Sequence, residues 1–314
     1  MMTRIDLAVW PADYGSPVTD DGPASTTVPV DYDCEVPQAA WRPLTPPALP
    51  ARPVTFVDGV RRMDARAWLT PDDGSTAPGL VGSWAAGAIR CDGAAAITDC
   101  RIERGLFSAV ADRPGLTTAE GLVFRGCATK SDTDAALRNG LQARMRALEL
   151  DVATDVAADG ELVVLDGPIR RRLPGRAVGY VKTQRVDYLA ESLRPAVAAL
   201  GVGERTPLFV LSTEIFKHWS WYLRLADVGS HPWEAVVRCE TPADGVDLPV
   251  ARALADEVTA LLPRFASSPH RDVRAPQNLY PIGALERHLR HRLGDAALVS
   301  RHLRRHVAAL AARA

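Results

Sequence analysis

The chain has 314 residues with a formal net charge of −1, and 47% of its residues are hydrophobic while 24% are charged. This ordinary globular composition excludes a collagen-like or wholly disordered chain, and it fits one large domain or two small ones. The chain has no overall positive charge, so any binding of nucleic acid depends on local clusters of Lys and Arg.

Two further classes are disfavoured by the sequence. No stretch reaches the roughly 20 apolar residues of a membrane-spanning helix, and the first 50 residues lack the pattern of a signal peptide. The five cysteines are scattered, never in C-x2-C spacing, so neither a zinc site nor a disulfide framework is expected. We therefore expect a cytoplasmic protein without a membrane partner.

Residues 1–50 form a segment of distinct composition. They hold nine of the 24 prolines and seven acidic residues, against two arginines. Because proline disrupts helices and central strands, we expect an extended acidic arm that packs on the core through Trp10, Tyr32 and Trp41. The remaining residues, 51–314, are expected to form the main domain.

The first half of that domain begins with strands and continues with a long helix. Strands are predicted at 54–57, 65–69 and 80–90, with Asp58-Gly59 closing the first of them. Apolar residues recur every three or four positions over 134–157 and predict a helix. The apolar run 162–165, closed by Asp166-Gly167, is typical of a strand buried on both faces.

The second half alternates strands with helices. Strands are predicted at 177–182, 207–213, 219–225 and 234–239, and helices at 187–200, at 249–262 and from about Pro281 almost to the end. This order predicts an α/β fold, a mixed sheet flanked by helices.

Three acidic side chains are candidates for metal binding. Asp58 and Asp166 each follow an apolar strand, where the sheet can hold the backbone while the carboxylate reaches a ligand. Glu149 lies on the shoulder of the apolar stripe of helix 134–157. Carboxylate oxygens suit Mg2+ or Mn2+, and two such ions can support phosphodiester hydrolysis. An Asp-Gly pair after a strand is also a common turn, so spacing alone leaves both readings open.

The C-terminal region is locally basic. From Arg264 to Ala314 there are ten arginines, three acids and five of the seven histidines. Such a long basic helix can neutralise backbone phosphates without regard to sequence, and a solvated face or a docking surface for an acidic partner is the alternative. Its apolar positions are expected to serve core or dimer packing: Leu289, Leu293, Val299, Leu303, Val307 and Leu310.

The order of several motifs resembles the NurA nuclease family over about residues 54–310. The matching pieces are Phe56-Val57-Asp58-Gly59, Arg144-x-Arg146-x-x-Glu149, Leu162 to Pro168, Val178 to Thr183, Trp221 to Leu225, Val236-Val237-Arg238, and Pro276-x-x-Leu279-Tyr280-Pro281 followed by Leu285 and His288. The sequence departs from the family at Val60, where serine is common.

The resemblance implies an RNase H-like fold and a Mn2+-dependent nuclease acting on single- and double-stranded DNA. It implies a homodimer that works with HerA, a hexameric ATPase, in DNA repair or phage defence. Asp58, Glu149 and Asp166 match the family's metal-binding acids, with Glu103 and Glu120 as alternatives for Glu149. Tyr280 and His288 match its active-site tyrosine and histidine.

Other residues have supporting roles in this hypothesis. His288 would ligate a second ion or act as a general acid, and Tyr280 would position a phosphate or water. Lys182, Arg224 and Arg238 each end a predicted strand and are candidate phosphate contacts. Two alternatives stay open: a catalytically inactive scaffold subunit of a motor complex, and a junction-resolving endonuclease on the same fold.

Overall fold

The computed structural model describes residues 4–7, 24–25, 28–50, 52–71, 73–112, 114–157, 160–169, 171, 173–182, 186–212, 217–227, 233–272 and 274–312. Trp10 and Thr183, which the sequence analysis singled out, lie outside these ranges. Among the helices of the described residues, none is long and apolar enough to cross a membrane.

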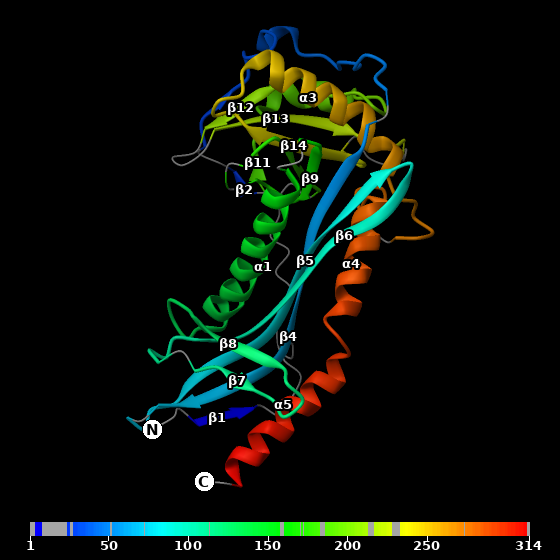
Figure 1. The fold of residues 1–314 in the computed structure, drawn as a ribbon. Coiled ribbons are helices and arrows are strands. Elements are labelled where there is room, and N and C mark those ends of the chain that lie inside the picture. Colours follow the sequence, from blue (N-terminus) through cyan, green and yellow to red (C-terminus); the bar gives the residue numbers. More distant parts are fainter. Residues whose placement is uncertain are drawn as a thin grey trace.

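One mixed sheet of 12 strands organises the molecule (Figure 1). Its strand order is β3-β12-β13-β14-β10-β9-β4-β5-β6-β8-β7, with β1 added to the far end of β4. The bounds of these strands are β1 Arg4–Leu7, β3 Val30–Asp31, β4 Val54–Thr70, β5 Ala77–Asp92, β6 Ala94–Ser108, β7 Leu116–Thr117, β8 Val123–Ala128, β9 Leu162–Asp166, β10 Arg176–Val181, β12 Phe209–Ser212, β13 Lys217–Arg224 and β14 Val236–Pro242. A separate pair joins β2 Ala24–Ser25 to β11 Val186–Asp187.

Helices cover both faces of this sheet. They are α1 Asp134–Ala157, α2 Arg194–Ala198, α3 Leu248–Leu261, α4 Tyr280–Arg292 and α5 Ala296–Ala311, with 3-10 turns η1 Gln38–Ala40, η2 Glu191–Leu193 and η3 Leu262–Phe265. Figure 1 shows α1 on one side of the long strands β4, β5 and β6, and α4 and α5 on the other. The expected α/β architecture with a helix-flanked mixed sheet is thus present.

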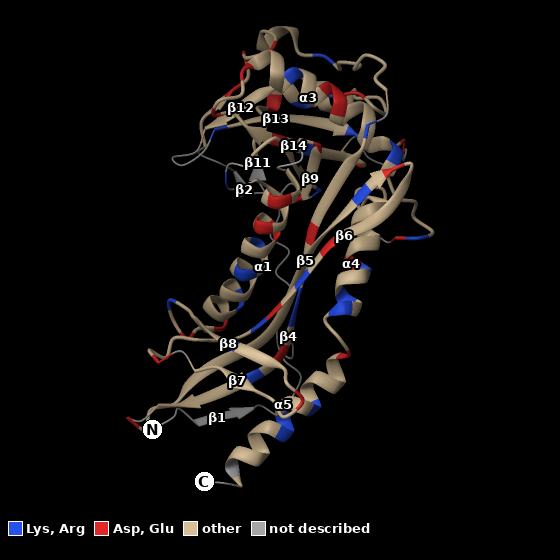
Figure 2. Cartoon of the chain, viewed as in Figure 1, with Lys and Arg blue, Asp and Glu red and all other residues tan. Residues whose placement is uncertain are grey.

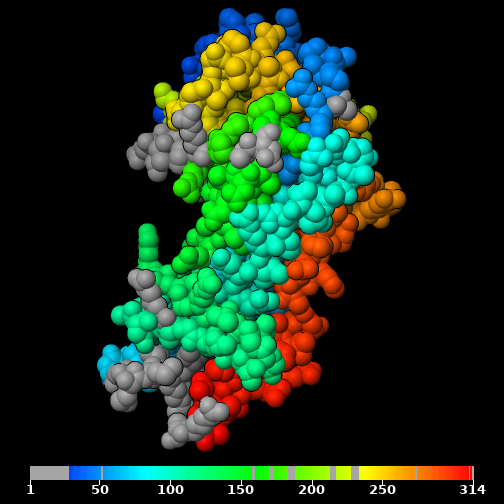
Figure 3. Space-filling view, viewed as in Figure 1, coloured from blue at the N-terminus to red at the C-terminus, as the bar shows by residue number. Residues whose placement is uncertain are grey.

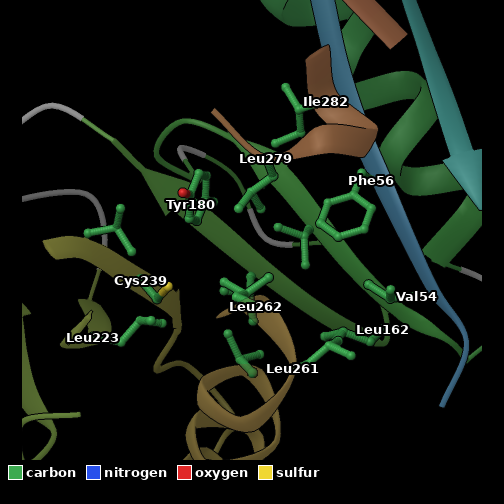
Figure 4. Close-up of a cluster of buried hydrophobic side chains, with 14 of the residues drawn as sticks. Val54, Phe56, Leu162, Tyr180, Leu223, Cys239, Leu261, Leu262, Leu279 and Ile282 are labelled. Atoms are coloured by element: carbon green, nitrogen blue, oxygen red, sulfur yellow. The ribbon is translucent and has the colours of Figure 1, made fainter. Parts of the chain in front are cut away.

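The two sides of the long strands carry separate cores. Phe56 and Val60 pack with Leu285 and Leu289 of α4, whereas Val57 packs with the α1 face. This division follows from the strand, because successive side chains point to opposite faces. Figure 4 shows the first core, where Phe56 faces Leu279 and Ile282 near the start of α4.

Several elements differ from the sequence predictions. Strand β4 runs unbroken through Asp58 and the predicted strand 65–69, with a register shift between Met63 and Ala65, because β5 pairs with it along its whole length. The long C-terminal helix is two helices, since Gly294 adopts a φ of 82° and Asp295 caps α5 by accepting a hydrogen bond from the Leu298 amide. The predicted helix 187–200 shrinks to η2 and α2, and β6 was not predicted.

The described part of the arm packs on the body. Strand β3 pairs with β12, and the rings of Tyr32 and Trp41 lie 6.0 and 6.1 Å from that of Phe209. Glu35 is buried and holds Arg205 through two hydrogen bonds of 2.8 Å. Residues 28–50 are therefore joined to the edge of the sheet. In Figure 3 the molecule is elongated, with residues of the arm (blue) at one end and residues of α5 (red) at the other.

Candidate metal centre

Strand register brings Asp58 and Asp166 to the same level of the sheet. Strands β4 and β9 are parallel, and their last paired residues are Val57 and Leu165. Each aspartate follows directly, so the two carboxylates stand side by side where β9 ends. Alternation along both strands turns them to the face that α4 covers, together with Phe56 and Val164. The pairing of β4 with β9 therefore stops at the residue before Asp58, although β4 itself continues.

A third carboxylate comes from α4. One oxygen each from Asp58, Asp166 and Glu286 lies within 4.8 Å of the others. The Oδ2 atom of Asp58 is buried and has no hydrogen-bond partner. A buried carboxylate oxygen without a partner is costly, and three converging oxygens form the kind of ligand set that Mg2+ or Mn2+ prefers. These residues therefore fit a divalent cation.

Glu149 approaches the same point from α1, on the other face of the sheet. A β-carbon added at Gly59 would lie 2.6 Å from Oε1 of Glu149. The absence of a side chain at Gly59 thus lets the carboxylate lie against β4. Burial, followed by the charge of Asp166, raises the pKa of Glu149 to about 8. Glu149 is not in the three-oxygen group but flanks it.

Burial and mutual repulsion set the protonation of the aspartates. Burial, then the charges of Asp166 and Glu149, hold the pKa of Asp58 well above its usual range. Burial also raises the pKa of Asp166, although Lys182 opposes this. For Glu286, burial acts to raise the pKa, but hydrogen bonds from Arg274 outweigh it and the pKa is lowered. A bound cation would relieve the repulsion among these groups.

Lys182 is held at this cluster from two sides. Its Nζ atom donates to Oδ2 of Asp166 at 2.6 Å and to Oδ1 of Asn278 at 2.7 Å. The Nδ2 atom of Asn278 donates to Asp272, a partner that only accepts when ionised, so the amide oxygen must face Lys182. The structure therefore places the predicted Lys182 beside the acids and adds Asn278 as its support.

Tyr280 and His288 do not join the cluster in this structure. The Tyr280 hydroxyl lies 2.6 Å from Oγ of Ser268, and 39% of the residue is exposed. His288 follows Glu286 by two positions, which is roughly 200° around a helix of 3.6 residues per turn. With Glu286 turned to the aspartates, His288 points away from them, and it is outside the three-oxygen group.

The predicted phosphate contacts Arg224 and Arg238 are internal instead. Arg224 is 9% exposed and donates to the carbonyls of Leu200 and Glu234. Arg238 is 6% exposed, pairs with Glu240 and stacks over the ring of Tyr188. We correct both assignments, because a guanidinium committed to internal partners is not available to a phosphate.

The alternatives to Glu149 lie elsewhere. Glu103 pairs in register with Trp84 on β5, three positions from Gly87, the register partner of Asp58. Glu120 forms ion pairs with His302 and Arg305. Neither is placed at the acidic group, whereas Glu149 lies against Gly59 and interacts with Asp166, so Glu149 stays the candidate from the sequence.

Glu286 and Asn278 are the residues that sequence reasoning missed. Glu286 is the single acid in α4, among five Arg and His residues. An isolated carboxylate in a basic helix was the available signal. Asn278 precedes α4 in an irregular segment, and nothing in the sequence marked it.

Metal binding should appear as a pH-dependent stabilisation. In the metal-free protein the raised pKa values of Asp58, Asp166 and Glu149 mean that ionisation favours the unfolded chain. Stability from these groups is fully present below the unfolded pKa of about 4 and is lost as the pH rises toward about 8 for Glu149. We expect Mn2+ at 100 times its Kd to add about 2.7 kcal/mol, or roughly 5 °C in Tm.

Calorimetry at pH 5 and pH 8, with Mn2+ or with EDTA, measures this effect. The Mn2+-dependent rise in Tm should be larger at pH 8, and Asp58→Asn should remove most of it. An equal rise in the variant would contradict binding at this cluster.

The fold of this chain is similar to that of a solved nuclease structure. The NurA nuclease from Sulfolobus solfataricus matches with 12% identity and a TM-score of 0.48, over 81% of this chain and 84% of that chain. No protein-family model and no curated protein matches the sequence.

Proposed function

We propose that this chain is a metal-dependent nuclease that hydrolyses phosphodiester bonds in DNA. The observation that carries the proposal is the meeting of Asp58, Asp166 and Glu286, with one oxygen of Asp58 buried and unpartnered. The order of motifs that resembles the NurA family supports the choice of DNA as substrate, on an RNase H-like core.

Asp58, Asp166 and Glu286 would hold the cation, and Glu149 would complete the site from the α1 side. A divalent ion there, Mn2+ or Mg2+, would supply charge stabilisation at the phosphoryl oxygens and lower the pKa of the attacking water. Three converging carboxylates and Glu149 beside them are enough to share between two ions, which is the number we propose.

The chain's own residues orient the substrate around this centre. Lys182 already donates to Asp166 and Asn278, and its third proton is free to donate to a phosphate oxygen. Asp58 and Asp166 are fixed by the paired backbones of β4 and β9, so their positions change little when substrate binds. Such preorganised charge is a main source of rate acceleration.

Finer proposals rest on the family resemblance. We propose that the chain forms a homodimer in the cytoplasm and works with a HerA-type hexameric ATPase in DNA end processing or phage defence. Tyr280 and His288 are proposed to serve the substrate side, from positions outside the acidic group. Co-elution of the chain with such an ATPase, and its mass by light scattering, test the two assemblies.

Nuclease assays on linear duplex, single-stranded and branched DNA test the main proposal. We expect cleavage in Mn2+ or Mg2+ and none in EDTA. If no substrate is cut in either metal, with or without the motor, the inactive scaffold is the better description. Preference for branched over linear DNA would identify a junction-resolving enzyme instead.

A further inference from the structure

A row of polar side chains on α1 lies against β4. Arg138, Gln142 and Arg146 follow one another at intervals of four residues, so they share one ridge of the helix. Arg138 donates from Nη1 to Sδ of Met63 at 3.0 Å, and Oε1 of Gln142 accepts from Nε of Arg61 at 2.5 Å. This ridge therefore faces the edge of β4.

The row leads to the acidic cluster. Met63, Arg61 and Gly59 alternate along β4 and so share its α1 face. Met63 contacts Arg138, and Arg61 contacts Gln142. Gly59 lies against Glu149. The helix thus runs antiparallel to the strand, and its basic positions end at Glu149. Figure 2 shows acidic residues on the part of α1 nearest β9 and basic residues farther along it.

Positive charge is concentrated in this row. Arg61 and Arg146 are exposed, and the hydrogen bond from Nε of Arg61 goes to a neutral amide. Burial of part of the side chain, followed by the charges of Arg138 and Arg146, lowers the pKa of Arg61. Asp134 pairs with Arg138 at one end of the row, and Glu149 lies at the other. A bound anion between these ends would relieve the repulsion among three arginines.

We infer that Arg61, Arg138 and Arg146 bind the phosphate backbone of one nucleic-acid strand and lead it to the acidic cluster. Arg138 and Arg146 are eight positions apart, which is about 12 Å at 1.5 Å per residue. At roughly 3.4 Å per phosphate along one strand of a duplex, this length matches three to four phosphates. The inference rests on the proposed function for the identity of its ligand.

This basic row is distinct from the C-terminal basic helices. Those helices pack on the opposite side of the long strands (Figure 1). The row on α1 is instead continuous with Glu149. The structure therefore favours the α1 side as the approach for the strand to be cut.

Binding of a labelled single-stranded oligonucleotide, followed by fluorescence anisotropy in EDTA over a series of salt concentrations, tests the inference. The double variant Arg61→Gln/Arg146→Gln should weaken binding on the order of tenfold near 0.1 M salt and reduce the salt slope by about 1.4. The matched control, Arg301→Gln/Arg304→Gln on α5, removes the same charge and should bind as the unmodified chain does. Both variants change exposed positions, and an unchanged Tm would confirm that they fold.

Loss of affinity in the α1 variant alone supports the row as the binding track. Equal losses in both variants, or a loss in the α5 control alone, would overturn it. Because EDTA prevents cleavage, the result is independent of nuclease activity: a chain that binds through this row but never cuts DNA refutes only the proposed function.

Discussion

Replacing Asp58 by asparagine is expected to reduce DNA cleavage by about a thousandfold or more, while making the metal-free protein no less stable. The substitution keeps the shape of the side chain and removes one negative charge from the acidic cluster. A thousandfold loss corresponds to about 4 kcal/mol of transition-state stabilisation, within the several kcal/mol that a divalent cation supplies. Stability is expected to hold or rise, because the ionised Asp58 is buried beside Asp166 and Glu149.

Two measurements separate this outcome from simple misfolding. Single-turnover cleavage in saturating Mn2+ gives the rate, and thermal unfolding in EDTA gives the stability. Glu103→Gln is the matched control, since it neutralises an exposed carboxylate on β6 outside the acidic group. A cleavage rate for Asp58→Asn within tenfold of the unmodified chain would remove Asp58 from the reaction.

Breaking the buried ion pair between the arm and the body should have the largest effect on stability. Arg205 is 1% exposed, and its guanidinium binds both oxygens of Glu35 as well as Asp256 at 2.7 Å. Glu35 also accepts from the Leu208 amide at 2.7 Å. Removing Glu35 leaves the buried guanidinium with the carboxylate of Asp256 alone and takes the acceptor from the Leu208 amide, so Glu35→Ala should cost about 3 kcal/mol of unfolding free energy.

Denaturant unfolding of Glu35→Ala, with Glu191→Ala as an exposed acidic control, measures this cost. The double variant Glu35→Met/Arg205→Met should recover part of the loss, because it removes the buried guanidinium together with Glu35 and keeps apolar volume, while Asp256, whose side chain is 16% exposed, loses its ion pair with Arg205. A loss below about 1 kcal/mol for Glu35→Ala would mean that residues 28–50 are not part of the cooperative fold.

The spacing of apolar residues predicted the helices and strands whose buried side chains recur at regular intervals. Helix α1 has the bounds that its apolar period predicts, because one face packs on the sheet throughout its length. Strand β9 is apolar on both faces since helices cover both. Strand β6 was not predicted because residues 94–98 are exposed and show no alternation of apolar and polar side chains. The break between α4 and α5 was signalled by Gly294-Asp295, although apolar residues continue on either side.

The residues of the candidate site likewise fall into those that the sequence marks and those that only the packing reveals. An apolar run followed by Asp-Gly marks Asp58 and Asp166 in the sequence, and the apolar stripe of α1 places Glu149 close by. Glu286 belongs to the cluster because α4 packs on the face of β4 that carries Asp58. The same packing directs His288 away from the aspartates. Arg224 and Arg238, equivalent to Lys182 as strand-end cations, proved internal.

The sequence by itself determined the elements with a regular pattern of burial, α1 and β9 among them, because hydrophobic period and turn residues act over a few neighbouring positions. It also marked Asp58 and Asp166, each directly after an apolar run, although β4 continues through Asp58. Only the tertiary structure decided which side chains share the acidic cluster, since that depends on strand register and helix docking between segments far apart in the chain. Such contacts produce no pattern in the sequence of either segment, so only the folded structure reveals them.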